Sequence, residues 1–561
     1  MTGETVSSAA RAETAFERIA ETDRPEVWIA LRDKDDVIAE ARAVDAAAAA
    51  GADLPLAGLV YAVKDNIDVA GLPTTAACPS YTYVPQRDAT AVARLRAAGA
   101  VCLGKTNLDQ FATGLVGTRS PYGAVRGAVD PARIAGGSSS GSAVAVALGI
   151  ADFALGTDTA GSGRVPAALN GIVGVKASLG AVPADGVVPA CPSYDCVTVF
   201  APDLTAAAAV LRRITGPSPT DPASRPRPDG APLSAPPAPR LAVPRPADLT
   251  ALDPDLTPLW DAALDRLAAT GATLTPIDIQ PLLAAALLLY EGALIAERAA
   301  AFGAHLDAHP GDADPVVAHL VGGAAKFTAA DLAADQQTLR RSRTEAAALL
   351  ADFDALVLPT APLHPTLDDV RADPVGVNAA LGTYTNFVNL LDLAAVAVPA
   401  GTAGTKHFGI SVVTAAFADQ IGADIAARFL GEHPPLIAPG GTDLVVFGAH
   451  MTGMPLNGQL TDLGARFIGD VRTAPAYRMH ALDTAPPKPF VTRSELGASL
   501  PGERWLLAPA ALGRFLADLP APMTLGKIEL DDGTWATGFC ATAPTGTDIT
   551  AAGGWRAHLT A

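Results

Sequence analysis

Short apolar runs alternate with longer amphipathic stretches over most of the chain. The apolar runs predict β-strands at residues 59–63, 101–103, 153–155, 355–358 and 394–398. The amphipathic stretches predict helices at residues 37–50, 88–99, 141–149, 255–270 and 281–304, with Asp88 as an N-cap. Strands that alternate with helices predict an α/β domain, and such folds place their active sites in the turns at strand ends.

Two clusters of proline and glycine interrupt this alternation. Residues 216–240 contain nine prolines, too many for a helix or a sheet, and predict an extended surface connection. A second cluster at residues 433–441 is followed by short β-like runs at 444–447, 527–530 and 535–539, with Asp532-Gly533 as a hairpin turn. We therefore expect an α/β domain over residues 1–432 and a smaller α+β domain over residues 442–561.

Composition and charge remove several classes of function. The chain carries 58 acidic and 40 basic residues, a net charge of −18, which excludes nucleic-acid binding by bulk charge. The most apolar stretch, residues 282–289, is too short to cross a membrane, and residues 1–20 show no secretory signal, so we expect a cytoplasmic protein without a membrane partner. Five cysteines in so long a chain predict reduced thiols rather than a disulfide framework.

Two glycine-rich loops that carry serines are the strongest chemical signal. They lie at residues 135–142, which include Ser138, and at residues 156–164, which include Ser162. Glycine allows the main chain to approach a ligand closely and to present several N–H groups to a developing oxyanion. The first loop lacks the Gly-Lys-Ser/Thr ending of a phosphate-binding loop, so ATP is not implied.

One alternative is the nucleophile elbow of α/β-hydrolases. Residues 137–141 match its G-x-S-x-G pattern, with Ser139 as the nucleophile. That chemistry requires a histidine base, and the nine histidines of the chain begin only at His305. The chain order of that fold allows a distant histidine, so the alternative stays open.

A lysine offers a different base. Lys64 follows the apolar run at residues 59–63, and burial lowers the pKa of an amine by disfavouring its charged form. Only 8 of the 40 basic residues are lysines, whereas 32 are arginines, which cannot lose a proton at ordinary pH. A lysine retained here is consistent with proton transfer.

These motifs together resemble the amidase signature family. Lys64-Asp65-Asn66, the two serine loops, residues 170–176 and residues 186–189 occur in the order typical of that family. The resemblance implies a mixed central sheet covered by helices and a Ser-Ser-Lys triad. Ser162 would be the nucleophile, Ser138 the proton bridge in a cis-peptide position, and Lys64 the base. The backbone N–H groups of Thr159, Ala160, Gly161 and Ser162 would form the oxyanion hole.

The substrate must be inferred from features outside the signature. Tyr290 and Arg298 lie eight residues apart, which places both on one face of a continuous helix. A guanidinium fork and a phenol suit a small carboxylate.

With the tail motifs at residues 446–457 and 473–478, the chain resembles the allophanate hydrolase family over nearly its whole length. This resemblance implies that Tyr290 and Arg298 hold the carboxylate of allophanate. The first domain would release ammonia from the terminal amide and leave N-carboxycarbamate. The second, with a γ-glutamyl cyclotransferase-like fold, would decarboxylate that product. The family also implies a homodimer.

His450 is the candidate acid for the second step, because a histidine can be protonated near pH 7. Glu503 is a weaker candidate. His305 and His309 have metal-like spacing but lack the glutamate of H-E-x-x-H, so we predict no metal and no cofactor. A general amidase, the amidotransferase subunit of the same family and a binding protein with an inactive amidase fold remain alternatives.

Overall fold

The computed structural model describes residues 7–438, 440–541 and 546–560. It divides into two compact units, one formed by Met1–Pro226 and Ala238–Ile437 and the other by Arg227–Pro237 and Ala438–Ala561. The outer ends of the two predicted domains, and Pro439 in the predicted boundary cluster, lie outside the described residues. Each unit is described by itself below.

The larger unit is built on one mixed sheet. Its described strands are β1 (Trp28–Leu31), β2 (Val60–Lys64), β3 (Val101–Thr106), β4 (Phe153–Asp158), β5 (Val173–Lys176), β6 (Cys196–Ala201), β7 (Arg240–Pro244), β8 (Thr273–Ile277), β9 (Ala355–Pro359), β10 (Leu393–Ala403) and β11 (Lys406–Ala415). Their order in the sheet is β1-β3-β2-β4-β6-β5-β10-β11-β9-β7-β8. β2 is parallel to both β3 and β4, whereas β4, β6, β5, β10 and β11 pair in antiparallel fashion.

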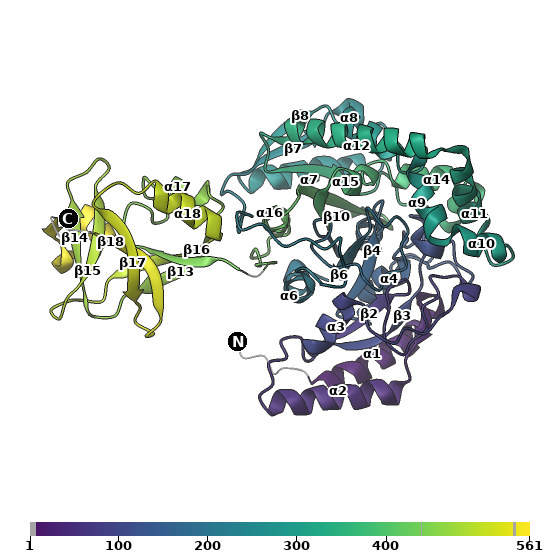
Figure 1. Cartoon of the computed structure of the whole chain (residues 1–561), viewed down its shortest axis with the longest axis horizontal. Helices are drawn as coiled ribbons and strands as arrows, with labels where there is room; N and C mark the ends of the chain where they lie inside the picture. The colour runs from purple at the N-terminus through teal and green to yellow at the C-terminus, as the bar shows by residue number, and fades with distance from the viewer. Residues whose placement is uncertain (1–6, 439, 542–545, 561) are drawn as a thin grey trace. The chain divides into compact units, whose positions relative to one another are not determined.

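Helices pack on this sheet and close its core. The described α-helices are α1 (Ser8–Thr22), α2 (Lys34–Ala49), α3 (Thr90–Ala97), α4 (Ser140–Ala147), α5 (Val165–Asn170), α6 (Leu204–Ile214), α7 (Thr257–Ala269), α8 (Gln280–Leu287), α9 (Ala296–Arg298), α10 (Ala304–Ala308), α11 (Pro315–Gly322), α12 (Ala329–Leu350), α13 (Leu367–Ala372), α14 (Gly376–Leu381), α15 (Asn386–Leu390) and α16 (Asp419–Leu430). α1 and α2 pack together beside β2 and β3, and α8, α12 and α15 form a separate group (Figure 1). Apolar side chains of α1, α2 and α4 form one cluster with β2, β3 and β4.

All five predicted strands of this unit are found, and the C-terminal end of each lies one to five residues beyond the prediction. Two helix predictions need correction. The helix expected to begin at Asp88 begins at Thr90, and the Asp88 carboxylate accepts the N–H of Ala70 at 2.7 Å instead of capping it. The helix expected over residues 281–304 is interrupted, because Gly292 is extended (φ −100°, ψ −179°) and separates α8 from the helical segment that contains α9.

The smaller unit contains two sheets. A five-stranded sheet has the order β13-β16-β12-β18-β17, and a three-stranded sheet has the order β15-β14-β19. The described elements are β12 (Thr442–Val446), α17 (Gly458–Thr461), β13 (Arg466–Arg472), β14 (Tyr477–Leu482), β15 (Lys488–Arg493), β16 (Pro501–Leu507), α18 (Pro509–Ala517), β17 (Met523–Glu529), β18 (Trp535–Ala541), β19 (Thr547–Asp548) and α19 (Trp555–Thr560). The predicted turn at Asp532-Gly533 joins β17 to β18, with Gly533 at φ +81°.

Part of the proline-rich stretch belongs to this smaller unit. Leu233 donates its N–H to the Gly464 carbonyl at 2.9 Å, and the Asp229 carbonyl accepts the N–H of Ala510 at 3.0 Å. The segment Arg227–Pro237 is therefore packed into the second unit, which its proline content alone does not reveal.

In the part of the chain that the structure describes, no single helix has the length and apolar character needed to cross a membrane. One strongly bent pair, Pro315–Lys326 with Ala329–Leu350, meets these criteria of length and composition when its two helices are joined.

Candidate active site

The candidate site lies where parallel strands end side by side. β2 ends at Lys64 and its parallel neighbour β4 ends at Asp158, so their last side chains reach the same edge of the sheet. Ser138 lies just before α4, which packs against both strands. Lys64 and Ser138 are fully buried, and Ser162 is 2 % exposed.

Lys64 contacts two hydroxyl groups. Its Nζ lies 2.8 Å from Ser138 Oγ and 2.7 Å from Thr157 Oγ1. Burial lowers the pKa of Lys64 to about 7, although the nearby carboxylates of Asp109, Asp195 and Asp158 oppose this change. A pKa in this region lies in the range in which a general base works best.

Close backbone packing places Ser138. The Gly137–Ser138 peptide bond is cis, as the family resemblance implies. A Cβ atom at residue 137 would lie 2.1 Å from Asp109 Oδ2, so no side chain larger than hydrogen fits there. The same carboxylate accepts the N–H groups of Gly117 and Arg119 at 3.0 and 2.9 Å, and it anchors the loop beside Ser138.

Ser162 does not contact Ser138 in this structure. Its hydroxyl is directed at the Gly114 carbonyl, with a long oxygen–oxygen distance of 3.4 Å, and no hydrogen bond joins the two serines in the described part of the chain. Hydrogen bonds of a catalytic relay are often long or absent until substrate binds. The first link of the expected relay, Lys64 to Ser138, is formed, and the second is not formed in this conformation.

The loop before Ser162 differs from the expectation at one position. The N–H of Gly161 donates to Asp158 Oδ1 at 2.9 Å, so it is not available to an oxyanion in this conformation. The N–H groups of Thr159, Ala160 and Ser162 have no hydrogen-bond partner among the described residues. Gly161 adopts φ +140°, which a side chain would strain, and its ideal Cβ would collide with Thr385. Three of the four expected donors are therefore free.

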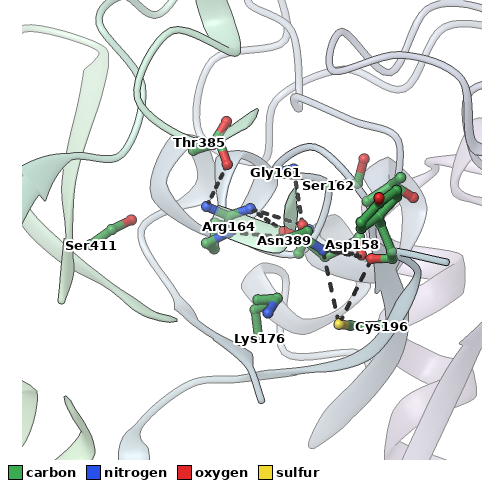
Figure 2. A network of polar contacts seen from close by, with 12 residues as sticks. Asp158, Gly161, Ser162, Arg164, Lys176, Cys196, Thr385, Asn389 and Ser411 are labelled. Carbon is green, nitrogen blue, oxygen red and sulfur yellow. Dashed lines mark hydrogen bonds and ion pairs between the residues drawn. The ribbon is translucent and has the colours of Figure 1, made fainter. Parts of the chain in front are cut away.

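A buried ion pair holds this loop in place (Figure 2). Arg164 binds both carboxylate oxygens of Asp158 through Nε and Nη2, each at 2.9 Å. Although burial alone raises it, the charge and hydrogen bonds of Arg164 keep the pKa of Asp158 below its ordinary value. Asn389, from α15, accepts from Arg164 at 3.1 Å and donates to the carbonyls of Asp158 and Tyr194 at 2.8 and 2.9 Å.

Ser139 is not placed as a nucleophile. Its hydroxyl donates to the Thr157 carbonyl at 3.0 Å and lies 3.3 Å from the N–H of the same residue, which it accepts. The side chain is fully buried and ties α4 to β4. The α/β-hydrolase alternative is therefore wrong, because the central serine of the G-x-S-x-G match has a structural role.

Tyr290 and Arg298 lie close together, although they do not belong to one continuous helix. Tyr290 lies in the turn after α8, and Arg298 ends α9, directly before a π-helical segment at Ala299–Gly303. The Arg298 guanidinium carbon is 4.8 Å from the centre of the Tyr290 ring. Arg298 is fully buried, and its Nε, Nη1 and Nη2 atoms have no hydrogen-bond partner among the described residues. Such unpaired buried charge is costly unless a ligand compensates it.

Tyr290 lines a cavity of about 230 Å³, whose lining includes neither Arg298 nor a residue of the nucleophile loop, residues 156–164. Asn378, in its wall, accepts the N–H of Leu115, which follows the Gly114 that faces Ser162. Most of its lining is apolar, from α8, α11 and α14. Its size suits a small molecule.

In the smaller unit, His450 lines a separate cavity of about 310 Å³ together with Lys488. Its Nε2 lies 2.9 Å from Gln459 Oε1, and its ring stacks on Phe539 with centres 5.0 Å apart. Burial lowers the pKa of His450 from 6.5, Gln459 opposes this effect, and the charge of Lys488 adds to it. The expectation that this ring is readily protonated at pH 7 is therefore not supported in the free protein.

The Glu503 side chain is buried, and its carboxylate already accepts several hydrogen bonds. Its carboxylate accepts from the N–H of Thr452, from the indole N–H of Trp505 and from Arg556, at 2.7, 3.1 and 2.9 Å. These contacts join β16 to a loop and to α19, which is a structural role.

The described residues contain no group of three or more His, Cys, Asp or Glu side chains arranged to hold a metal ion. The rings of His305 and His309 stack with centres 4.3 Å apart, and His305 Nε2 lies 3.0 Å from Ser80 Oγ. Cys191, one of the two cysteines close in sequence, has its thiol against Glu297.

The fold, the buried lysine–serine pair and the glycine loops define a class of enzyme. The amidase family profile matches residues 11–432, and the chain belongs to this family of amidohydrolases. The predicted fold class is thereby confirmed, with the mixed sheet and helices described above. A second profile, the allophanate hydrolase C-terminal domain, matches residues 442–560.

Within that class, the chain is an allophanate hydrolase-like amidase. The solved allophanate hydrolase of Kluyveromyces lactis is 38% identical, with a TM-score of 0.88 over 99% of this chain and 97% of that chain. The urea amidolyase of Saccharomyces cerevisiae is 40% identical over 546 residues, which cover 90% of this chain and 30% of that protein. The chain thus spans about 30% of the length of this curated relative. A glutamyl-tRNA(Gln) amidotransferase chain of Symbiobacterium thermophilum is 35% identical over 74% of this chain and 91% of its own length.

Sequence reasoning assigned no role to several residues of this site. Thr157, Asp195 and Asn389 contact the lysine or the nucleophile loop through side chains that no local motif singles out. Asp158 and Arg164 belong to the glycine-rich segment that carries the resemblance, and their spacing was the one signal that could have identified the ion pair.

Proposed function

We propose that the larger unit hydrolyses the terminal amide of allophanate, urea-1-carboxylate, with a Ser-Ser-Lys triad. The observation that carries this proposal is the fully buried Arg298, whose three nitrogen atoms are unpaired and lie beside Tyr290. A guanidinium fork binds a carboxylate through two parallel hydrogen bonds, and allophanate carries one carboxylate at the end opposite its amide. The names of the relatives point to the same substrate.

The geometry supports a proton relay. Neutral Lys64 takes a proton from Ser138, Ser138 takes one from Ser162, and Ser162 Oγ attacks the amide carbon. The N–H groups of Thr159, Ala160 and Ser162, which have no other partner in the described part of the chain, would stabilise the oxyanion. Loss of one such donor typically costs about 2.7–4 kcal/mol of transition-state stabilisation.

The relay then reverses to release the first product. The proton on Lys64 returns through Ser138 to the leaving nitrogen, and ammonia departs as the acyl-enzyme forms. Water, deprotonated by the same relay, attacks the acyl carbon and regenerates Ser162. The products are ammonia and N-carboxycarbamate, so that one amide bond breaks and one water molecule is consumed.

The direct test measures ammonia release from allophanate by the wild-type chain, Ser162→Ala and Arg298→Ala. Ser162→Ala should have no activity. Arg298→Ala should lose at least about a hundredfold in kcat/KM, because a charge-assisted bidentate contact is removed. Biuret, which carries a carboxamide in place of the carboxylate, is the matched control substrate, and its kcat/KM should change little in Arg298→Ala. Equal losses on both substrates would contradict the assignment of Arg298.

We further propose that the smaller unit decarboxylates N-carboxycarbamate in the cavity that His450 and Lys488 line. Lys488 supplies a positive charge for the dianion. The bound dianion would in turn raise the pKa of His450 and favour the protonated ring, which donates a proton to nitrogen as carbon dioxide leaves.

His450→Asn tests this step. It should leave the initial rate of ammonia release from the terminal amide intact and prolong the lifetime of N-carboxycarbamate, followed by ¹³C NMR. An unchanged lifetime would remove His450 from the reaction. The expected homodimer is a separate proposal that analytical ultracentrifugation tests.

A further inference from the structure

One turn is hydrogen-bonded both to the nucleophile loop, residues 156–164, and to the residue that precedes Arg298, the proposed carboxylate-binding residue. This turn, residues 191–195, ends at Asp195, whose carboxylate accepts the N–H groups of Ala190 and Cys191 at 2.9 and 3.1 Å. The same carboxylate accepts a hydrogen bond from the Thr159 hydroxyl. Thr159 is the residue that follows β4, and its own N–H is one of the free donors. Asp195 therefore holds the first residue of the proposed oxyanion hole.

The same turn is also held by Glu297 of α9. Ser193 donates its N–H to Glu297 Oε2 at 2.9 Å, and the Cys191 thiol lies 3.3 Å from the same oxygen. Glu297 directly precedes Arg298 in the chain. A continuous set of hydrogen bonds thus runs from Thr159 through the turn to the residue next to the buried arginine.

Asp195 also contributes charge to the site. It is 8 % exposed. Burial raises its pKa to about 6, while the Thr159 hydroxyl, two N–H groups and the positive charge of Arg298 limit the rise. The charge of the ionised Asp195 carboxylate interacts with both Arg298 and Lys64.

We propose that Asp195 is a positioning residue that couples the proposed carboxylate-binding Arg298 to the catalytic relay, because it fixes Thr159 by a hydrogen bond and its carboxylate interacts electrostatically with both Arg298 and Lys64. This proposal rests on the function proposed above for Arg298 and Lys64. Asp195 touches neither the reacting amide nor the nucleophile. It acts through the position of Thr159 and through the charges on the two basic side chains.

The charged and titratable groups around this pair come from several elements. The groups that act on Asp195 or on its turn are Lys64 of β2, Arg298 and Glu297 of α9, Arg343 of α12, the phenol of Tyr194, and the thiols of Cys191 and Cys196. The groups that act on Lys64 are Asp109, Asp158 and Asp195. Among these, only Asp195 influences both the lysine and the arginine.

The test uses Asp195→Asn in the full-length chain, with Asp261→Asn, an exposed position on α7, as the matched control. Loss of one negative charge lowers the pKa of Lys64 further, so the acidic limb of the pH profile should move to lower pH, by roughly half a unit. The KM for allophanate should fall severalfold, because the arginine loses a competing charge, whereas the KM for biuret should not. The kcat should fall on both substrates as Thr159 loosens. A merely structural role would lower kcat without moving the acidic limb.

A second pair of variants separates the hydrogen bond from the charge. Thr159→Val removes the hydroxyl and should lower kcat on both substrates, and Thr159→Ser should restore most of it. An acidic limb of Asp195→Asn that coincides with the wild-type limb, or lies at higher pH, overturns the proposal. A Thr159→Ser variant as impaired as Thr159→Val also overturns it.

Labelling of the active-site serine by a fluorophosphonate distinguishes two failures. One is failure of the proposed allophanate activity, and the other is failure of the proposed role of Asp195. Labelling of Ser162 needs the neutral base but not allophanate, so its rate against pH reports on Lys64 directly. If the wild-type chain is labelled but releases no ammonia from allophanate, the proposed function fails. The labelling profiles of wild type and Asp195→Asn then still decide the role of Asp195, and they also do so if the Asn variant is partly unfolded, because each profile is normalised to its own maximum.

Discussion

Each of the two units buries one basic side chain, Lys64 at the end of β2 and His450 in a cavity wall. Desolvation lowers the pKa of both groups, but it has opposite consequences for their proposed roles in proton transfer. Burial lowers the pKa of Lys64 from 10.5 to about 7, which brings the amine into the range where it accepts a proton. Burial also lowers the pKa of His450 from 6.5, which disfavours the protonated imidazole that could donate a proton. Desolvation alone therefore does not identify a catalytic group, since its effect depends on the starting pKa.

The surroundings of the two groups reinforce this difference. Three carboxylates, Asp109, Asp195 and Asp158, limit the fall in the pKa of Lys64. His450 has aromatic neighbours, one amide and the positive charge of Lys488, which lowers its pKa further. The proposed base role of Lys64 fits its surroundings in the free protein, whereas the proposed acid role of His450 requires a bound anion that raises its pKa.

Removal of the Lys64 amine should have the largest effect on activity. Lys64→Ala should lower kcat on the order of 10³-fold or more, because both proton transfers of the relay lose their terminal base. Lys64→Arg is the control that keeps a positive charge but cannot lose it, and it should be equally inactive. Circular dichroism checks that both variants are folded. A loss below about tenfold would show that another base serves Ser138.

The pH dependence of kcat/KM should show the second largest effect, because it reports the pKa of Lys64. Lys64 works as the neutral amine, so kcat/KM should fall about tenfold per pH unit below its pKa of about 7 and level off above it. A limb near pH 10, where an unburied lysine titrates, would contradict the role of burial. The profile should be measured only where the unfolding signal shows a fully native protein.

Thr157 tunes the same amine by a hydrogen bond at 2.7 Å. Thr157→Val keeps the shape of the side chain and removes the acceptor, so Lys64 loses one contact that favours its charged form. We expect a decrease of severalfold in kcat, from a less well oriented amine, and an acidic limb displaced to lower pH. Ser139→Ala removes a hydroxyl that contacts the main chain of Thr157 rather than Lys64, and it should leave the acidic limb in place.

The smallest expected effect concerns the second unit. Lys488→Met removes the positive charge near His450 and should raise the pKa of that ring by a few tenths of a unit, measured by NMR titration. Arg493→Met, with an exposed guanidinium on the same strand, is the matched control and should leave the pKa of His450 unchanged. A pKa of His450 at or above 6.5 in the wild type would remove the contrast between the units.

Much of the site was predictable because its signals are local. Lys64 follows an apolar strand, and Ser138 and Ser162 lie in glycine-rich loops, so short segments of sequence carry both the geometry and the chemistry. Tyr290 and Arg298 lie close together, but not on the one helix from which their proximity was predicted, because Gly292 interrupts that helix.

The amino-acid sequence by itself determined the strand and helix pattern, the serine loops, the lysine and the family to which they belong. It did so because backbone preferences and burial patterns act over a few residues. Only the tertiary structure decided which groups set the charge states. Asp195 and Asn389 lie far along the chain from Lys64 and Arg164, the Gly161 N–H turned out to be taken by Asp158, and His450 is buried among aromatic rings. Electrostatic and hydrogen-bond effects depend on distance in space and on exclusion of water, and both are properties of the folded chain.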